Sequence, residues 1–399
     1  MTNKISNFLK YCIKITLVKG LRLISRFKSS KIDDNLLIFG AYQGESFLGN
    51  TKYLFLYLNE FSDYECIWVS RSKEVVRELS EMGYNSLFAF TFKALSKLRK
   101  ARCVFMSHGK GDVLPIKFSK KTKLVFTYHG NPIKKVGFDS PSNIVNRYDA
   151  KALDLFSKEI SYILVSSEDE KRKMGTAYRI PLERIIVTGY ARHDFLSNRT
   201  DEDIKIFKER LGFPQDIKNI ILYGPTFREE KIAKMPFSKT NMIELDKFLK
   251  ESNSILIFKA HPGVTEIATI DLDNIMIPDS YLDPQELLLA SDVLIFDYSS
   301  IMFDFLLTGN KPVISFPYDL EFYKKERGLY YDYLKFIPAP IVYNIPDLIY
   351  HLKTIKSWSS EYEERRRNVC KLVNTFNDGN SSKRVAEFLG LKLNAKSVN

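Results

Sequence analysis

A series of short apolar runs, which begins twice along the chain, constrains the fold most strongly. The first series comprises Asn35–Gly40, Cys66–Ser70, Cys103–Ser107 and Lys123–Thr127, and a helical stretch through Tyr53–Asn59 follows its first run. Short apolar runs that alternate with helices are typical of the strands of a parallel sheet. The first series therefore predicts an α/β domain.

A second series of the same kind comprises Asn219–Gly224, Ser254–Phe258, Asp292–Phe296 and Pro312–Phe316. The stretch between the two series is polar and contains the turn-forming sequence LGFPQD, which places a domain boundary near residues 201–216. A chain of 399 residues is also long for a single core. The sequence thus predicts two Rossmann-type parallel-sheet α/β domains, residues 33–205 and 206–399, preceded by a separate segment, residues 1–32.

The strand end within Asp292–Phe305 (DVLIFDYSSIMFDF) gathers acid and hydroxyl groups. Open parallel sheets bind ligands beyond the carboxyl ends of their strands, so a cleft between the two domains is the expected site. Ser299 and Ser300 fall near the start of a helix expected from Ile301, where free N–H groups and the helix dipole suit a phosphate-bearing ligand. A simple helix cap by either serine explains the same residues.

Two histidines also follow predicted strands. His129 lies on a loop that contains glycine and proline, and Lys134 and Lys135 follow closely. Nearby positive charge favours the neutral imidazole that a general base requires. His261 follows the run Ser254–Phe258 in the second series. A single loop histidine can equally be structural, but two strand-end histidines, one from each domain, indicate a shared site.

The sequence YGPTFR, residues 223–228, places a hydroxyl and a guanidinium after another predicted strand. Thr226 and Arg228 could hold phosphate oxygens there, and Lys259 could point into the same cleft. The alternative for Arg228 is a surface ion pair with Glu229 or Glu230.

The formal net charge of +12 is compatible with nucleic acid, an anionic membrane surface or a phosphorylated ligand as partner. Residues 1–32 contain no acidic residue, yet basic residues interrupt their apolar ones: Lys4, Lys10, Lys14, Lys19, Arg22, Arg26, Lys28 and Lys31. No apolar run there approaches the roughly 20 residues of a spanning helix, and lysines break any signal-peptide core. We expect an interfacial helix on an anionic membrane surface; a helix docked on the protein's own core is the alternative.

Other partners and cofactors have weaker support. The basic residues form no recognisable nucleic-acid module, so nucleic acid is not an expected partner. Scattered cysteines without disulfide or metal-ligand spacing indicate a reducing cytoplasm; they are Cys12, Cys66, Cys103 and Cys370. Carboxylates also lack obvious metal-ligand spacing, and we expect neither a metal nor another cofactor.

Seven segments in series resemble the CDP-glycerol glycerophosphotransferase family, the teichoic acid primases and polymerases of the bacterial envelope. They are YHGNPIKKVGFD (128–139), TGYARHDFL (188–196), YGPTFRE (223–229), KAHP (259–262), DVLIFDYSSIMFDF (292–305), YDLEFYKKERGLYYDY (318–333) and DGNSSKRV (378–385). Each segment alone is a weak signal. Their order and spacing, over roughly residues 36–386, make the match specific.

The resemblance implies a GT-B-like fold, peripheral attachment to the cytoplasmic face of the cell membrane, and synthesis of teichoic acid, capsule or a related envelope polymer. The implied reaction transfers glycerol phosphate, or a related polyol phosphate, from a CDP-linked donor to a lipid-linked glycan or polymer acceptor. His129 would activate the acceptor hydroxyl. The implied donor-binding residues are Thr226, Arg228, His261, Asp297, Ser299, Ser300 and Arg327.

The chain departs from the family pattern at three places. Tyr128 stands where members commonly have Trp, Asn131 where they have Thr, and Ala191-Arg192-His193-Asp194 where they have Pro-Arg-Asn-Asp. We therefore expect acceptor or polyol choice to differ. Two rival interpretations are a GT-B glycosyltransferase with a nucleotide-sugar donor and a non-enzymatic basic protein that assembles envelope machinery or binds nucleic acid.

Overall fold

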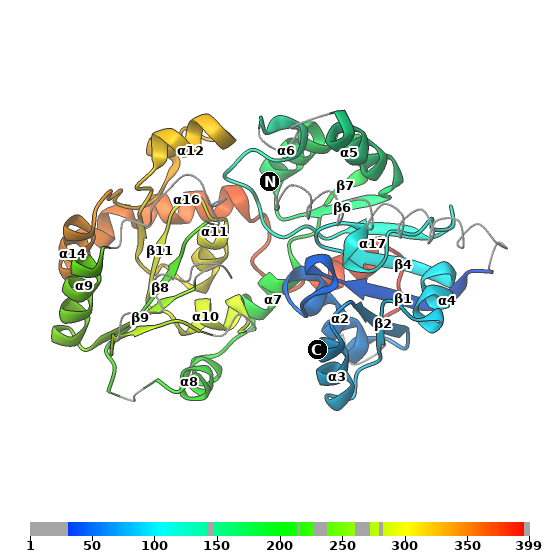
Figure 1. Cartoon of the computed structure of the whole chain (residues 1–399), viewed down its shortest axis with the longest axis horizontal. Coiled ribbons are helices and arrows are strands. Elements are labelled where there is room, and N and C mark those ends of the chain that lie inside the picture. Colours follow the sequence, from blue (N-terminus) through cyan, green and yellow to red (C-terminus); the bar gives the residue numbers. More distant parts are fainter. Residues whose placement is uncertain are drawn as a thin grey trace, which may run out of the picture.

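Two parallel sheets form the two lobes of the protein, as the sequence predicts (Figure 1). The computed structural model describes residues 31–141, 147–213, 216–226, 238–259, 272–278 and 282–394. The predicted membrane-surface segment, residues 1–32, lies outside this range except for its last two residues. No helix of the described chain is long and apolar enough to cross a bilayer.

The first sheet contains seven strands in the order β3-β2-β1-β4-β5-β6-β7, all paired in parallel. Their bounds are β1 Asp33–Gly40, β2 Glu65–Ser70, β3 Ser86–Phe88, β4 Ala101–Met106, β5 Lys123–Phe126, β6 Tyr162–Val165 and β7 Ile185–Val187. The four predicted runs correspond to β1, β2, β4 and β5. We did not predict β3, β6 and β7, which have only three or four residues each.

The second sheet has the order β10-β9-β8-β11-β12, also parallel. Its strands are β8 Asn219–Gly224, β9 Ser254–Phe258, β10 Ile275–Met276, β11 Val293–Phe296 and β12 Val313–Ser315. Only the two-residue strand β10 was not predicted.

Helices cover both sheets. Those of the first half are α2 Gly49–Phe61, α3 Lys73–Glu81, α4 Phe92–Lys100, α5 Arg147–Glu159, α6 Glu168–Tyr178, α7 Ala191–Ser197 and α8 Asp201–Arg210. Those of the second half are α9 Lys239–Glu251, α10 Pro284–Ala290, α11 Ile301–Phe305, α12 Leu320–Arg327, α13 Tyr333–Phe336, α14 Ile345–Lys353, α15 Ile355–Trp358, α16 Glu363–Val373 and α17 Ser381–Phe388.

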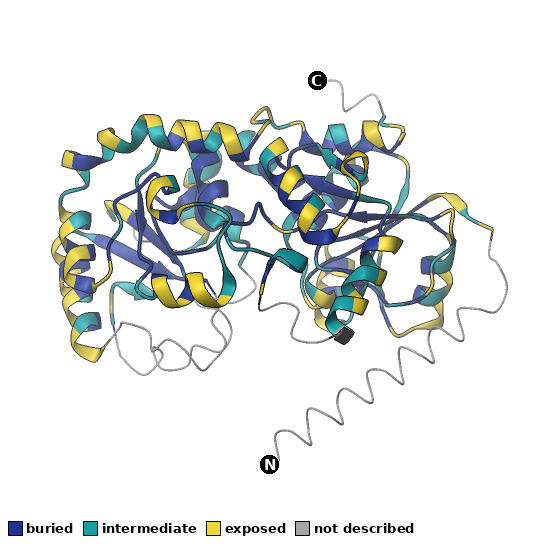
Figure 2. Ribbon diagram, turned by 90° about the horizontal axis from the view of Figure 1, so that it is seen from above, coloured by how far each residue is buried: buried dark blue, intermediate teal, exposed yellow. Residues whose placement is uncertain are grey.

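Strand β1 shows why its apolar run is continuous. Leu37 and Phe39 pack into one hydrophobic cluster, whereas Leu36 and Ile38 pack into another, and all four are fully buried. Alternate side chains of a strand point to opposite faces, so a strand covered on both faces needs apolar residues at every position. Figure 2 shows the strands buried inside each lobe beneath helices with exposed outer faces.

The chain passes between the lobes twice. It first leaves the lobe of the first sheet after α7 and reaches β8. It returns after α16, where Thr375 donates its backbone N–H to the Ser166 carbonyl, 2.9 Å away. Helix α17 then packs against α2 and α7, and its Val385 and Ala386 join the core of the first lobe. The domain ranges predicted from the sequence include α17 in the second domain, residues 206–399.

Candidate functional site

The loop after β5 holds His129 in a constrained position. Asn50, in the first turn of α2, donates from Nδ2 to the carbonyls of Thr127 and Tyr128, both 3.0 Å away. Tyr128 is buried and has a φ of +52°. A bulky residue in this left-handed region costs about 1–3 kcal/mol and persists only where its surroundings enforce it. The next residue, His129, is exposed to solvent.

The hydrogen bonding of His129 suits a general base. Its Nδ1 lies 3.2 Å from the carbonyl oxygen of Ser107. Because a carbonyl only accepts, Nδ1 must carry the proton, and Nε2 keeps its lone pair. Desolvation by the surrounding chain lowers the pKa of His129 well below its ordinary value. Electrostatic interactions with the ring of His108 and with Lys134 and Arg192 lower this pKa further, and the hydrogen bond to Ser107 opposes the shift. The ring is therefore neutral at pH 7 and able to accept a proton.

His108 is a neighbour of this base that we did not predict. It follows β4, next to β5 in the sheet, and its ring stacks on that of His129 with centroids 4.3 Å apart. His129 was selected because it follows a predicted strand. His108 meets the same criterion, because it directly follows the predicted run Cys103–Ser107. That signal was present in the sequence.

The His129 loop meets the start of α11 from the other lobe. A Cβ atom on Gly130 would lie 2.5 Å from Ser300 Oγ and 3.3 Å from Arg192 Nη2. Ser299 and Ser300 are both half-buried. Ser300 makes no side-chain capping bond, and Ser299 Oγ accepts only a long bond, 3.4 Å, from the N–H of Ile301. The structure thus brings the predicted base and the predicted serines together.

A second contact between the lobes lies further along the same loop. Ile133 accepts a hydrogen bond from the N–H of Tyr330, at 2.9 Å, and Lys135 donates its N–H to the carbonyl of Gly328, at 3.0 Å. Arg327, a predicted donor-binding residue, ends α12 immediately before Gly328. This position brings Arg327 to the segment that pairs with the His129 loop.

Thr226 and Asp297 bind each other. Asp297 is fully buried and accepts from the Thr226 N–H at 2.9 Å and from its hydroxyl at 2.6 Å. Tyr333 donates to the Asp297 carbonyl at 2.5 Å. These contacts join the end of β8 to the end of β11, just before Ser299 and Ser300 in the chain. We expected the two residues to contact the donor, and the structure adds this mutual bond.

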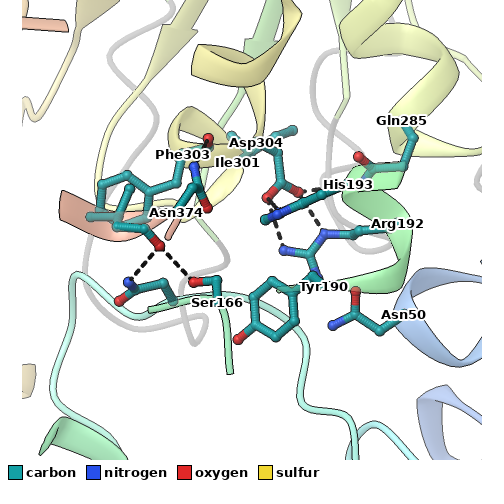
Figure 3. Close-up of polar contacts among 12 residues, drawn as sticks. Asn50, Ser166, Tyr190, Arg192, His193, Gln285, Ile301, Phe303, Asp304 and Asn374 are labelled. Atoms are coloured by element: carbon teal, nitrogen blue, oxygen red, sulfur yellow. Dashed lines mark hydrogen bonds and ion pairs between the residues drawn. The ribbon is translucent and has the colours of Figure 1, made fainter. Parts of the chain in front are cut away.

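A buried ion pair lies beside the site (Figure 3). Arg192 in α7 binds Asp304 in α11 through two bonds, 2.7 and 2.9 Å long, and His193 Nε2 lies 2.9 Å from the same carboxylate. Burial alone raises the pKa of Asp304, but Arg192 and His193 outweigh it and hold that pKa below its ordinary value. Asp304 was within a motif that we singled out, although we did not predict its partners.

Two predicted donor-binding residues, Arg228 and His261, lie outside the described residues. Lys259, just ahead of His261, donates from Nζ to the carbonyl of Leu282 at 2.6 Å. No group of three or more His, Cys, Asp or Glu side chains in the described part of the chain is placed to hold a metal ion.

The residues that depart from the family pattern, Tyr128, Asn131, Ala191 and His193, are all buried. Tyr128 and Asn131 are each only 2% exposed. Asn131 accepts a bond from Lys173 Nζ at 3.0 Å and lies 3.4 Å from the carbonyl of Val373. Any effect of these two residues on ligand choice must therefore act through the shape of the loop.

A large hollow lies away from His129. A groove of about 890 Å³ runs along α2 and is also lined by residues of α3 and α7, including Tyr57, Phe61 and Phe195. Its lining includes neither His129 nor the serines of α11. Hydrogen bonding and proximity between the lobes, rather than cavity size, therefore identify the candidate site.

Comparisons with known proteins agree with this architecture. The model of the family CDP-Glycerol:Poly(glycerophosphate) glycerophosphotransferase matches residues 22–390. The chain is 30% identical to the teichoic acid glycerol-phosphate transferase of Staphylococcus aureus, covering 96% of this chain and 99% of that protein. It is 31% identical to a teichoic acid poly(glycerol phosphate) polymerase of Bacillus spizizenii, covering 90% and 92%.

A solved structure of the wall teichoic acid polymerase TagF with CDPG has the same fold. It superposes on this chain with a TM-score of 0.81, at 22% identity, over 98% of both chains. The chain belongs to the CDP-glycerol glycerophosphotransferase family.

Proposed function

We propose that the protein transfers glycerol phosphate from CDP-glycerol to a hydroxyl of a lipid-linked glycan or polymer acceptor and releases CMP. Family membership supports the class of reaction. One structural observation carries the assignment of the site: the Nε2 lone pair of His129 is available at an exposed ring, and Ser300 of the opposite lobe lies against the adjacent Gly130.

In the proposed step, Nε2 of His129 takes the proton of the acceptor hydroxyl as its oxygen attacks the β-phosphorus of the donor. A bond forms between that oxygen and phosphorus, the bond to the CMP oxygen breaks, and CMP leaves with the electron pair. Negative charge grows on phosphate oxygens during such a transfer, so fixed hydroxyl and cationic groups stabilise it. We assign this role to Ser299, Ser300, Arg228, His261 and Arg327, with Thr226 and Asp297 shaping the same strand ends.

CMP release with CDP-glycerol and a synthetic polyprenyl-diphosphate glycan acceptor tests the proposal. His129→Ala should lower acceptor-dependent CMP release about 10²- to 10⁴-fold, the usual contribution of a general base. His351→Ala is a matched control, because His351 is a half-buried residue of α14 whose Nδ1 binds the Asp347 carbonyl of its own helix. Undiminished turnover in His129→Ala would remove His129 from the mechanism.

The donor and the need for metal have separate tests. CDP-ribitol and nucleotide sugars, offered in place of CDP-glycerol, distinguish polyol phosphate transfer from glycosyl transfer by the product formed. Turnover should persist in EDTA. If EDTA abolishes it and Mg²⁺ restores it, the expectation of a metal-independent reaction is wrong.

We also propose that the protein attaches to the cytoplasmic face of the membrane through residues 1–32. Their eight basic and no acidic residues support this, because each basic residue near an anionic surface contributes about 1 kcal/mol. The combined variant Lys10→Glu, Lys14→Glu, Lys19→Glu should sediment much less with anionic vesicles. Lys151→Glu, Lys158→Glu, Lys205→Glu changes the net charge equally in helices α5 and α8, and should sediment almost as wild type.

A further inference from the structure

We propose that His108 is a positioning residue for His129: it fixes the ring of the base by stacking against it, so that Nδ1 points to Ser107 and Nε2 is left for the acceptor. This inference rests on the proposed role of His129 as the base. It assigns His108 no contact with either substrate.

The sheet brings the two rings together. Strands β4 and β5 pair in parallel, with Met106 opposite Phe126, so the chain emerges from both strands at the same edge. His108 and His129 follow these strands by two and three residues. Their rings lie 4.3 Å apart between centroids with an angle of 7° between their planes, so they stack face to face in close contact.

The ring of His108 is itself held from other directions. Its Nδ1 lies 2.8 Å from Ser107 Oγ, and the ring of Tyr42 lies 4.4 Å away at 45°. The backbone N–H of His108 donates to Asp112 Oδ2 at 2.7 Å. His108 is therefore a fixed surface against which a second ring can be oriented.

The loop that carries His108 is organised by one buried carboxylate. Asp112 also accepts from the N–H of Ser107, at 2.7 Å, and from the N–H of Gln43, at 2.7 Å. Tyr42 and Gln43 both have positive φ values, 50° and 59°, in the segment that delivers the Tyr42 ring. The carboxylate thus joins the strand-end segments of β1 and β4, which together hold His108.

His129 needs a second restraint. A single hydrogen bond of 3.2 Å from Nδ1 and the tilted ring of Tyr128, 4.3 Å away, do not fix the plane of this exposed ring. The ring must present Nε2 to the acceptor hydroxyl within hydrogen-bond reach, and misplacement by about 1 Å can cost about 100-fold in rate. Stacking restricts the plane of the ring, and the bond to Ser107 restricts its direction. Burial lowers the pKa of His108 to about 4, so this stacked partner is neutral near pH 7 and adds no positive charge to those of Lys134 and Arg192.

The kinetic test compares three variants. His108→Ala should lower kcat for CMP release by at least about tenfold, while the KM for CDP-glycerol changes by less than about twofold, because only the geometry of the base is lost. His108→Phe keeps a stacking ring and should restore most of the lost kcat. His351→Ala should match wild type. Equal losses in His108→Ala and His108→Phe, or no loss in either, would overturn the proposal.

A spectroscopic test is independent of turnover. Long-range ¹H–¹⁵N NMR of histidine-labelled full-length protein, with His129 assigned from the signal missing in His129→Gln, reports which ring nitrogen carries the proton. Wild type and His108→Phe should show His129 protonated on Nδ1, whereas His108→Ala should show a mixture of both tautomers.

The two tests separate this inference from the proposed function. If CDP-glycerol gives no CMP with any variant, the reaction is wrong, but the NMR result still decides whether His108 orients His129. If His108→Ala fails to fold, wild type and His108→Phe still decide: a wild-type His129 protonated on Nε2, or a mixture in either protein, would overturn the inference.

Discussion

His193 shows how burial decides the charge of a residue in this protein. Burial lowers its pKa, although the hydrogen bond to Asp304 opposes that shift. A neutral His193 therefore donates from Nε2 to the carboxylate, while Nδ1 has no hydrogen-bond partner among the described residues. The positive charge that balances Asp304 comes from Arg192 alone.

The lowered pKa of His193 predicts how stability depends on pH. Between its folded pKa and about 6.5, the unfolded state binds more protons than the folded state, so the free energy of unfolding rises with pH in this window. This contribution is lost as the pH falls. In calorimetry, His193→Asn should show a smaller increase in Tm between pH 5 and 7 than wild type. An unchanged pH dependence would contradict the assignment of a neutral, buried His193.

Sequence reasoning selected candidate site residues by their position along the chain. His129, Ser299 and Ser300 follow apolar runs, and the structure places Gly130, next to His129, against Ser300. The partners of Asp304 could not be found in this way, because Arg192 is 112 residues distant in sequence and only the packing of α7 on the second lobe unites them. The mutual bond of Thr226 and Asp297 likewise depends on the order of strands in the folded sheet.

At the scale of elements, the contact between the His129 loop and α11 depends on Gly130. Its φ of +145° is strained for any other residue, and a Cβ there would clash with Ser300 Oγ. Gly130→Ala should therefore push the loop away from the serines and lower kcat/KM by at least about 100-fold, as for a misplacement of about 1 Å. Steady-state kinetics at saturating acceptor would measure this.

Gly309→Ala is the matched control for that variant. Gly309 also has a positive φ, +113°, but no atom lies within 4 Å of its Cβ position. Both variants should lose about 1–3 kcal/mol of stability from backbone strain, and only Gly130→Ala should lose activity. Equal kinetics in the two would mean that the contact with Ser300 does not matter.

The longest strands were the plainest in the sequence. The continuous runs of β1, β8 and β9 have five or more residues and are buried on both faces, so their pattern is plain in the sequence. Strands β3 and β10 have three and two residues, too few to show a period, and exist because longer neighbours offer them hydrogen bonds. Helix α11 begins at Ile301, as expected, but ends at Phe305, where a tighter 3₁₀ turn over Leu306–Thr308 follows it.

For the whole molecule, the pair of Arg192 and Asp304 joins the lobes at the site. Both side chains are buried, so removing one leaves an uncompensated charge, which costs about 3–5 kcal/mol. Arg192→Met and Asp304→Leu should each destabilise the protein by this amount in urea unfolding. The double variant should lose less than the sum of the two, which gives a favourable coupling energy.

An exposed pair supplies the control for that cycle. Lys158 and Asp154 form an ion pair in α5 at 2.7 Å, with both side chains largely accessible to water. Such pairs contribute about 0–1 kcal/mol, so Lys158→Ala should leave the unfolding midpoint almost unchanged. A similar small effect for Asp304→Leu would show that the buried pair does not hold the lobes together.

The return of the chain to its first lobe changes what a break in the backbone would do. A protease that cut between α8 and β8 would produce two fragments, and the second fragment would still carry α17 packed against α2 and α7 of the first. Neither piece could diffuse away until that helix was pulled from its core. The enzyme would survive such nicking as a non-covalent complex, and two separately synthesised halves could reassemble into one active molecule.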